Sequence, residues 1–234
     1  VWIGTWKGLN LYDKQTCKII PFPDTRLLDK GINYMAADKE DNIWIGAGNT
    51  IYRCNSTASI AREYDIFGSQ QNKHTINFVY QDREGNMWVL TGGGLFKYDD
   101  KSDSFITYPP LGKNNAPYTM CQDQSGNYWI GTWGEGLWQF FPQKEGEECY
   151  KRHHIINSRS GETEPIFYSM TQDNTFGYLW LLSYNELYAL QYTEEGTLVS
   201  VDIHDLVDTH MMYTKIMKDR EGNLWLGSYD MAYT

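Results

Sequence analysis

Asp123-Gln124-Ser125-Gly126-Asn127-Tyr128-Trp129-Ile130-Gly131-Thr132 is the stretch of sequence that decides the fold. Segments 82–88 and 219–225 repeat its pattern of Asp, two variable residues, Gly-Asn, an apolar or aromatic residue and Trp. An Asp carboxylate accepts hydrogen bonds from backbone N–H groups two or three residues further on, and Gly adopts the positive φ that such a turn needs. The stretch therefore predicts a β-hairpin turn followed by a short apolar strand.

This tryptophan recurs along the whole chain at intervals of 41 to 51 residues. The six copies are Trp2, Trp44, Trp88, Trp129, Trp180 and Trp225. An aspartate precedes the last five, at Asp38, Asp82, Asp123, Asp173 and Asp219. The gap from Asp to Trp is six residues, except that it is seven in the copy that starts at Asp173. A repeat of this length, with room for four short strands, predicts an all-β fold, a β-propeller of four-stranded antiparallel blades.

The strands around these tryptophans are apolar on both faces, as in Ile43-Trp44-Ile45. Sheets packed face to face bury both faces, so we interpret the tryptophans as core residues. We expect one domain over 1–234, with complete blades at about 32–67, 76–108, 118–155 and 166–203 and partial blades at both ends. The order of the terminal strands favours a piece of a larger ring over a closed five-bladed ring.

Composition narrows the classes of partner. Thirty acidic and 20 basic residues give a net charge of −10, which repels a phosphate backbone and argues against nucleic acid. No run of 18 apolar residues is present, so we expect no membrane span in this piece. The four cysteines have no CxxC spacing, which favours buried free thiols over a disulfide or a metal site. We expect no metal and no other cofactor.

The repeat resembles the two-component regulator propeller family. The resemblance is clearest at residues 123–132, followed by Gly136-Leu137-Trp138. It implies the periplasmic sensor region of a hybrid two-component protein, as in Bacteroidetes-like bacteria, with an oligosaccharide as ligand and no enzymatic activity in this region. It also implies that the rest of the sensor chain, or a second copy in a homodimer, is a partner. Leu90 and Leu182 depart from the pattern because they replace the Gly after the apolar strand.

Loops on a rigid β-scaffold commonly carry ligand sites. In a propeller, the loops between strands two and three share a face with the loops between blades, whereas the Asp turns lie on the other face. The residue after the apolar strand is equivalent in all six copies, and four of the six are aromatic. These aromatic residues are Trp6, Trp133, Tyr184 and Tyr229. We predict that they are stacking platforms for sugar rings; the alternative is that they only cover the ends of the blades.

Polar residues in the loops between blades suit sugar hydroxyls, which need donors and acceptors together. The candidates are Arg26, Lys73, His74, Asn114 and Arg159. The alternative for each of these residues is solvated surface without a ligand, and the sequence does not rank one loop above another.

Two other functions remain open. A propeller lyase or hydrolase acting on a glycan or a cyclic ester would need a metal or a His/Glu pair, for which His74, His210 and Glu135 are candidates. No Gly-x-Ser-x-Gly, His-Glu-x-x-His or P-loop motif supports an enzyme. A protein-interaction scaffold is the third possibility.

Overall fold

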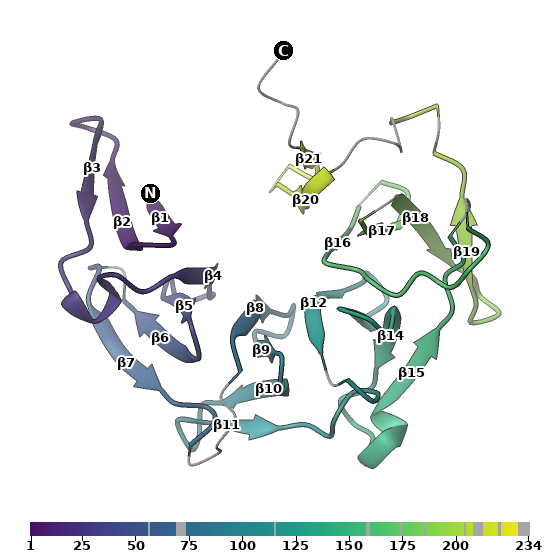
Figure 1. Cartoon of the computed structure of the whole chain (residues 1–234), viewed down its shortest axis with the longest axis horizontal. Helices are drawn as coiled ribbons and strands as arrows, with labels where there is room; N and C mark the ends of the chain where they lie inside the picture. The colour runs from purple at the N-terminus through teal and green to yellow at the C-terminus, as the bar shows by residue number, and fades with distance from the viewer. Residues whose placement is uncertain are drawn as a thin grey trace. The chain divides into compact units, whose positions relative to one another are not determined.

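The computed structural model describes residues 1–55, 57–68, 74–114, 116–157, 160–173, 175–184, 186–203, 205–207, 213–219 and 221–228. The chain divides into two compact units, Val1–Pro110 and Leu111–Thr234. Every sheet is antiparallel and its strands follow chain order (Figure 1). The described helical segments are two 3₁₀ turns, η1 (Thr25–Leu27) and η2 (Gly146–Cys149). The predicted all-β fold of propeller blades is confirmed.

The first unit contains one three-stranded and two four-stranded sheets. The first sheet consists of β1 (Trp2–Thr5), β2 (Gly8–Asp13) and β3 (Lys18–Pro21). The second consists of β4 (Ile32–Ala37), β5 (Ile43–Ala47), β6 (Thr50–Cys54) and β7 (Ile60–Tyr64). The third consists of β8 (Ile76–Gln81), β9 (Met87–Thr91), β10 (Gly94–Asp99) and β11 (Ser104–Thr107). The first strands of neighbouring sheets lie side by side, and Tyr34 of β4 contacts Phe78 of β8 with ring centroids 4.3 Å apart.

The second unit repeats this arrangement with two four-stranded sheets and one two-stranded sheet. The first consists of β12 (Pro117–Gln122), β13 (Tyr128–Thr132), β14 (Leu137–Phe140) and β15 (Tyr150–His153). The second consists of β16 (Ser169–Gln172), β17 (Leu179–Leu182), β18 (Leu187–Tyr192) and β19 (Leu198–Val201). The last pairs β20 (Tyr213–Lys218) with β21 (Leu224–Ser228).

Each Asp turn ties its loop to the tryptophan that follows. Asp123 Oδ1 accepts hydrogen bonds from the backbone N–H groups of Ser125 and Asn127 at 2.9 and 2.8 Å. Its Oδ2 accepts from the indole Nε1–H of Trp129 at 2.9 Å. The equivalent bond from indole to carboxylate is 2.8 Å in the other four turns. Gly126 has the expected positive φ of 85°, and Asp41 has φ of 61° at the same position in its turn.

The tryptophans are core residues in the complete sheets only. Trp44, Trp88, Trp129 and Trp180 are buried, and Trp129 packs against Tyr192 of the neighbouring sheet at 5.5 Å. The core prediction is wrong for Trp225, which is 60% exposed. In the described part of the chain, the sheet of β20 and β21 contacts the neighbouring sheet mainly through β20, with Leu224 and Leu226 of β21 also packed against it, and the indole of Trp225 remains uncovered. Trp2 is half-buried against Phe22.

A β-bulge recurs in the first strand of four of the sheets. The pairing register shifts by one residue at Asn33, Asn77, Tyr118 and Thr214. A bulge turns one side chain out of the alternating pattern of the strand. In two of these sheets the bulge residue contacts the loop that joins strands two and three, Asn33 at Gly48 and Tyr118 at Trp133.

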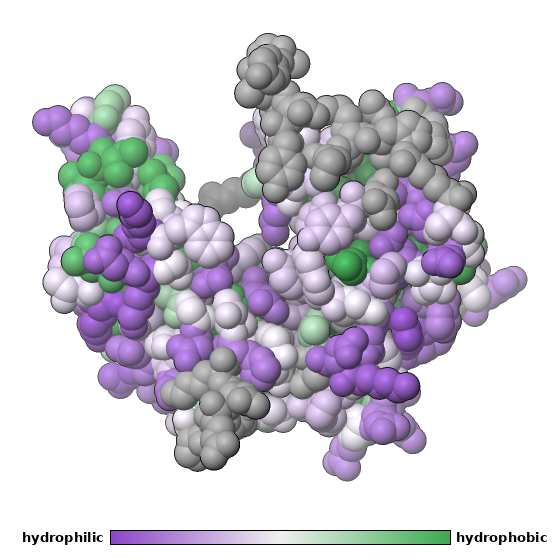
Figure 2. Space-filling view, in the orientation of Figure 1, coloured by the Kyte–Doolittle hydropathy of each residue, from purple (hydrophilic) through white to green (hydrophobic). Residues whose placement is uncertain are grey.

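Two surface features complete the fold. Apolar side chains gather over β2 and β3, where Ile19 and Ile20 are exposed on an edge strand (Figure 2).

The described cysteines are free thiols, and three are buried as expected, but Cys17 is exposed. Cys17 has a positive φ of 54° in the turn between β2 and β3, which holds it at the surface.

Candidate functional site

The predicted aromatic residues of the second unit lie in two neighbouring loops. Trp133 begins the loop between β13 and β14, and Tyr184 lies in the loop between β17 and β18. The first loop is held by backbone bonds, since the N–H groups of Gly134 and Gly136 both donate to the carbonyl of Pro165, at 2.9 and 2.7 Å. These contacts fix the backbone that carries Trp133.

Four aromatic rings form one continuous cluster here. Trp133 lies 5.2 Å from Tyr118 on one side and 5.2 Å from Tyr184 on the other, between ring centroids. Tyr168 lies 5.7 Å from Tyr184. Trp133 remains 41% exposed and Tyr184 49% exposed, so both rings are accessible. We call Tyr118, Trp133, Tyr168 and Tyr184 the aromatic cluster.

The sequence prediction missed Tyr118 and Tyr168. Tyr118 is the bulge residue of β12, and Tyr168 precedes β16 at the equivalent position. The bulge turns Tyr118 toward Trp133, and the hydroxyl of Tyr168 donates to the carbonyl of Tyr213 at 2.5 Å. The signal available in the sequence was a tyrosine at the same position, eleven or twelve residues before the Trp, of two consecutive repeats.

Asn114 is the predicted polar residue that lies beside this loop. Glu135 Oε1 accepts hydrogen bonds from the backbone N–H groups of Lys113 and Asn114, both at 2.8 Å. The amide nitrogen of Asn114 would lie 3.5 Å from a Cβ at Gly134, next to Trp133. Glu135, a candidate for the enzymatic alternative, therefore uses its carboxylate to hold a loop.

A buried carboxylate supports the loop that follows β15. Glu164 is buried, and its Oε2 accepts from Asn157 Nδ2 at 3.1 Å and from the Tyr188 hydroxyl at 3.3 Å. Ile166, two residues further on, forms a β-bridge with Trp133. The network thus links the core of the next sheet to the backbone beneath the aromatic cluster.

The first unit fills the equivalent positions differently. Gly48 and Gly92 stand where Trp133 stands, and the bulge residues are Asn33 and Asn77. Asn33 Oδ1 accepts a hydrogen bond from the Gly48 N–H at 3.0 Å. These two sheets therefore present a polar amide and backbone instead of aromatic rings.

The remaining candidates of the first unit are dispersed. Trp6 is almost fully exposed in the loop between β1 and β2, beside Gly31. Arg26 is paired with Asp24, with its Nη2 2.6 Å from a carboxylate oxygen, and this pairing raises the pKa of Arg26. His74 packs over Gly92 and Gly93. The structure does not join these three into one site.

Three predicted site residues, Tyr229, Lys73 and Arg159, lie outside the described residues, as does His210. Within the described part of the chain, no group of three or more His, Cys, Asp or Glu side chains could hold a metal ion.

The aromatic cluster suits binding without covalent chemistry. Burial, and then the neighbouring Tyr184, raise the pKa of Tyr118, so its phenol is neutral at pH 7 and can both donate and accept hydrogen bonds. Exposed ring faces next to neutral polar groups can hold a ligand with apolar C–H faces and hydroxyl edges.

Comparison with known families confirms the resemblance drawn from the sequence. The model of the family described as two component regulator propeller matches residues 111–134 and 208–230. The first match covers the start of the second unit up to Trp133 and Gly134. No curated protein matches the chain.

Solved structures share the fold at low sequence identity. A virginiamycin B lyase from Staphylococcus aureus aligns with a TM-score of 0.70 and 15% identity, over 97% of this chain and 73% of that one. The extracellular domains of two putative hybrid two-component systems from B. thetaiotaomicron align with TM-scores of 0.66 and 0.55. Their identities are 18% and 20%, and in each case the alignment covers 99% of this chain and 38% of that one. The chain thus spans well under half the length of these sensor domains. No helix in the described ranges is long and apolar enough to cross a membrane.

Proposed function

We propose that this chain, which carries two-component regulator propeller repeats, is part of the ligand-sensing region of an extracytoplasmic two-component sensor. The family match and the shared fold with extracellular sensor domains support this role. On this proposal the region lies in the periplasm, works without its own catalytic activity, and passes its signal to the rest of the sensor chain or to a second copy.

The proposed ligand is an oligosaccharide bound at the aromatic cluster. The observation that carries this proposal is the run of four rings in contact, with Trp133 and Tyr184 both accessible. Sugar rings present C–H faces that pack on indole and phenol, and their hydroxyls can bond to neighbouring phenol and amide groups such as Asn114.

The test is a binding screen on a glycan array, followed by calorimetric titration of each hit. Replacing Trp133 or Tyr184 by Ala should weaken binding about tenfold or more, because each change removes one stacking face. Phe176→Ala is the matched control, since Phe176 is an exposed aromatic residue of the same unit in the Asp173 turn, at the opposite end of its sheet. Equal affinity of all three variants and the original protein would refute the site.

The structural likeness to a lyase keeps an enzymatic alternative in view. This alternative requires product formation from candidate oligosaccharides or cyclic esters, measured by chromatography with and without a chelator. Binding without turnover under both conditions favours the sensor. A protein partner on the loops would instead appear as a complex in size-exclusion chromatography.

A further inference from the structure

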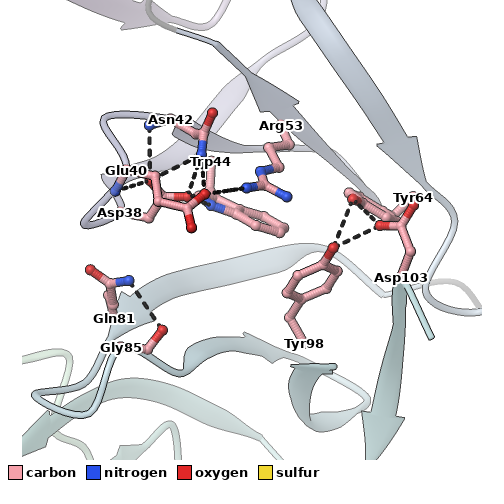
Figure 3. A network of polar contacts seen from close by, with 10 residues as sticks. All are labelled: Asp38, Glu40, Asn42, Trp44, Arg53, Tyr64, Gln81, Gly85, Tyr98 and Asp103. Carbon is pink, nitrogen blue, oxygen red and sulfur yellow. Dashed lines mark hydrogen bonds and ion pairs between the residues drawn. The ribbon is translucent and has the colours of Figure 1, made fainter. Parts of the chain in front are cut away.

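A polar groove lies on the turn side of the first unit, at the opposite end of its sheets from the loop positions considered above. It runs between the β4–β5 turn and the β8–β9 turn and has a volume of about 280 Å³. Lys39 Nζ donates to the carbonyl of Arg83 at 2.6 Å and joins the two turns across it. Arg53 of β6 and Tyr98 of β10 line its inner part (Figure 3).

Arg53 is held in place at the base of this groove. Its guanidinium carbon lies 5.2 Å from the ring centroid of Trp44 and 6.0 Å from that of Tyr98. Its Nη2 is 3.1 Å from Glu40 Oε2, and its side chain is 21% exposed. Nη2 also lies 3.9 Å from Asp38 Oδ2, and Tyr64 lies within hydrogen-bonding reach of the guanidinium. Because a guanidinium has five N–H donors, Arg53 retains donors for a bound acceptor. The guanidinium is thus positioned before any ligand arrives.

Acceptors stand around this donor. Glu40 is exposed at the rim, and the carboxylate of Asp100 makes no hydrogen bond within the described part of the chain. Gln81 donates its amide N–H to the carbonyl of Gly85 at 3.1 Å, which leaves its carbonyl oxygen as an acceptor. The groove therefore offers both kinds of hydrogen-bonding partner within a small volume.

The charges of the lining select among ligands. Four carboxylates, from Asp38, Glu40, Glu84 and Asp100, face two cations, Lys39 and Arg53, for a formal net charge of −2. This balance disfavours an anion, while the guanidinium at the base needs an acceptor, which an ammonium group cannot supply. A hydroxyl group satisfies both conditions because it is neutral, donates to carboxylates and accepts from a guanidinium. The volume lies just below the roughly 300–1,000 Å³ of pockets for drug-sized ligands and suits one sugar ring.

We propose that this groove binds a single neutral sugar residue, or a polyol of similar size, through Arg53, Glu40 and Asp100. The site is separate from the aromatic cluster and does not depend on it. It could hold a free monosaccharide or one residue of a longer glycan, and the shared chemistry is the set of neighbouring hydroxyl groups.

The test is an NMR titration of the full ¹⁵N-labelled chain, which follows the Trp44 indole N–H and the Arg53 Nε–H. Glucose, galactose and mannose are the neutral probes, and glucuronate and glucosamine are the charged ones. At least one neutral sugar should give saturable shifts of both signals, with about tenfold weaker binding of its charged counterparts. Absence of saturable shifts with every neutral sugar, or tighter binding of glucuronate than of glucose, would overturn the proposal.

Two variants locate the site and separate it from the proposed function. Asp100→Ala removes an exposed acceptor, and Arg53→Lys keeps the charge while it removes the planar fork of donors. Each should weaken the neutral sugar about tenfold, and a cooperative urea transition checks that each variant is folded under the titration conditions. The double variant Trp133→Ala/Tyr184→Ala should leave this titration unchanged, even if it abolishes oligosaccharide binding. Unchanged affinity in both Asp100→Ala and Arg53→Lys would place the sugar elsewhere and refute the groove.

Discussion

Burial, and not the number of hydrogen bonds, should decide what each Asp turn contributes to stability. Asp123 and Asp219 make the same four bonds, to two backbone N–H groups, an Asn amide and an indole, at 2.8–3.0 Å. They differ in their surroundings, because Trp129 is 1% exposed whereas Trp225 is 60% exposed. The pair therefore offers a matched comparison within one unit.

The perturbation is Asp123→Ala beside Asp219→Ala. The first leaves the indole N–H of Trp129 and the backbone N–H of Asn127 without their acceptor in a buried setting. At about 1–3 kcal/mol for each unsatisfied donor, the expected loss is about 2–6 kcal/mol. Water can replace the carboxylate of Asp219 because its donors are exposed, so the second variant should lose much less stability.

The assay is equilibrium urea unfolding followed by both tryptophan fluorescence and far-UV circular dichroism. Coincident transitions and equal m values are needed before the midpoints are converted to free energies. Equal losses in the two variants would refute the reasoning, because the bond geometry is shared and only the burial differs. A negligible loss for Asp123→Ala would refute it as well.

Three further predictions concern acid and the exposed edge. Burial acts to raise the pKa of Asp38 and Asp173, but hydrogen bonds from backbone and indole N–H groups outweigh it. The pKa of each carboxyl group is therefore lower than usual. These two carboxylates should contribute fully to folding stability above about pH 4, and the contribution should be lost as the pH falls through their lowered pKa values. Urea unfolding at a series of pH values measures this loss. Burial, and then nearby positive charges, lower the pKa of His153 to about 4. As the pH falls, the unfolded chain takes up a proton at His153 before the folded chain does, so stability should decrease from about pH 6.5 to pH 4. His153→Gln should remove this part of the dependence of stability on pH. An unchanged dependence in the variant would assign it to other groups. Ile19→Lys with Ile20→Lys should lower any self-association measured by light scattering, because charges protect edge strands, and an unchanged mass would exclude this edge as the contact.

The strands were predictable because their signals are local. Strands β4 and β8 form where short apolar runs stand between clear turn residues. The bond between Asp and Trp was missed, although its signal was the nearly constant gap of six residues. The seven-residue gap from Asp173 to Trp180 keeps the same 2.8 Å bond, because Asp173 accepts N–H bonds from Thr175, Phe176 and Gly177 in a wider turn.

The site was predictable only in part, because it depends on which side chains meet between sheets. Equivalent positions in the repeat identified Trp133 and Tyr184, which do lie in contact. The same argument could not show that Arg26 would pair with Asp24. It also gave no indication of the groove at Arg53, since that groove is lined by residues of two sheets far apart in the sequence.

The extra residue in the first strand lies outside the alternating pattern, so its side chain can vary without changing the side chains that pack in the core. The register shifts by one residue in the same way at Asn33, Asn77, Tyr118 and Thr214, yet these positions carry three kinds of side chain. An amide, a phenol or a hydroxyl can thus be exchanged there while the apolar neighbours keep their places. Recognition in such a repeat can diversify one position at a time, with little cost to the scaffold that carries it.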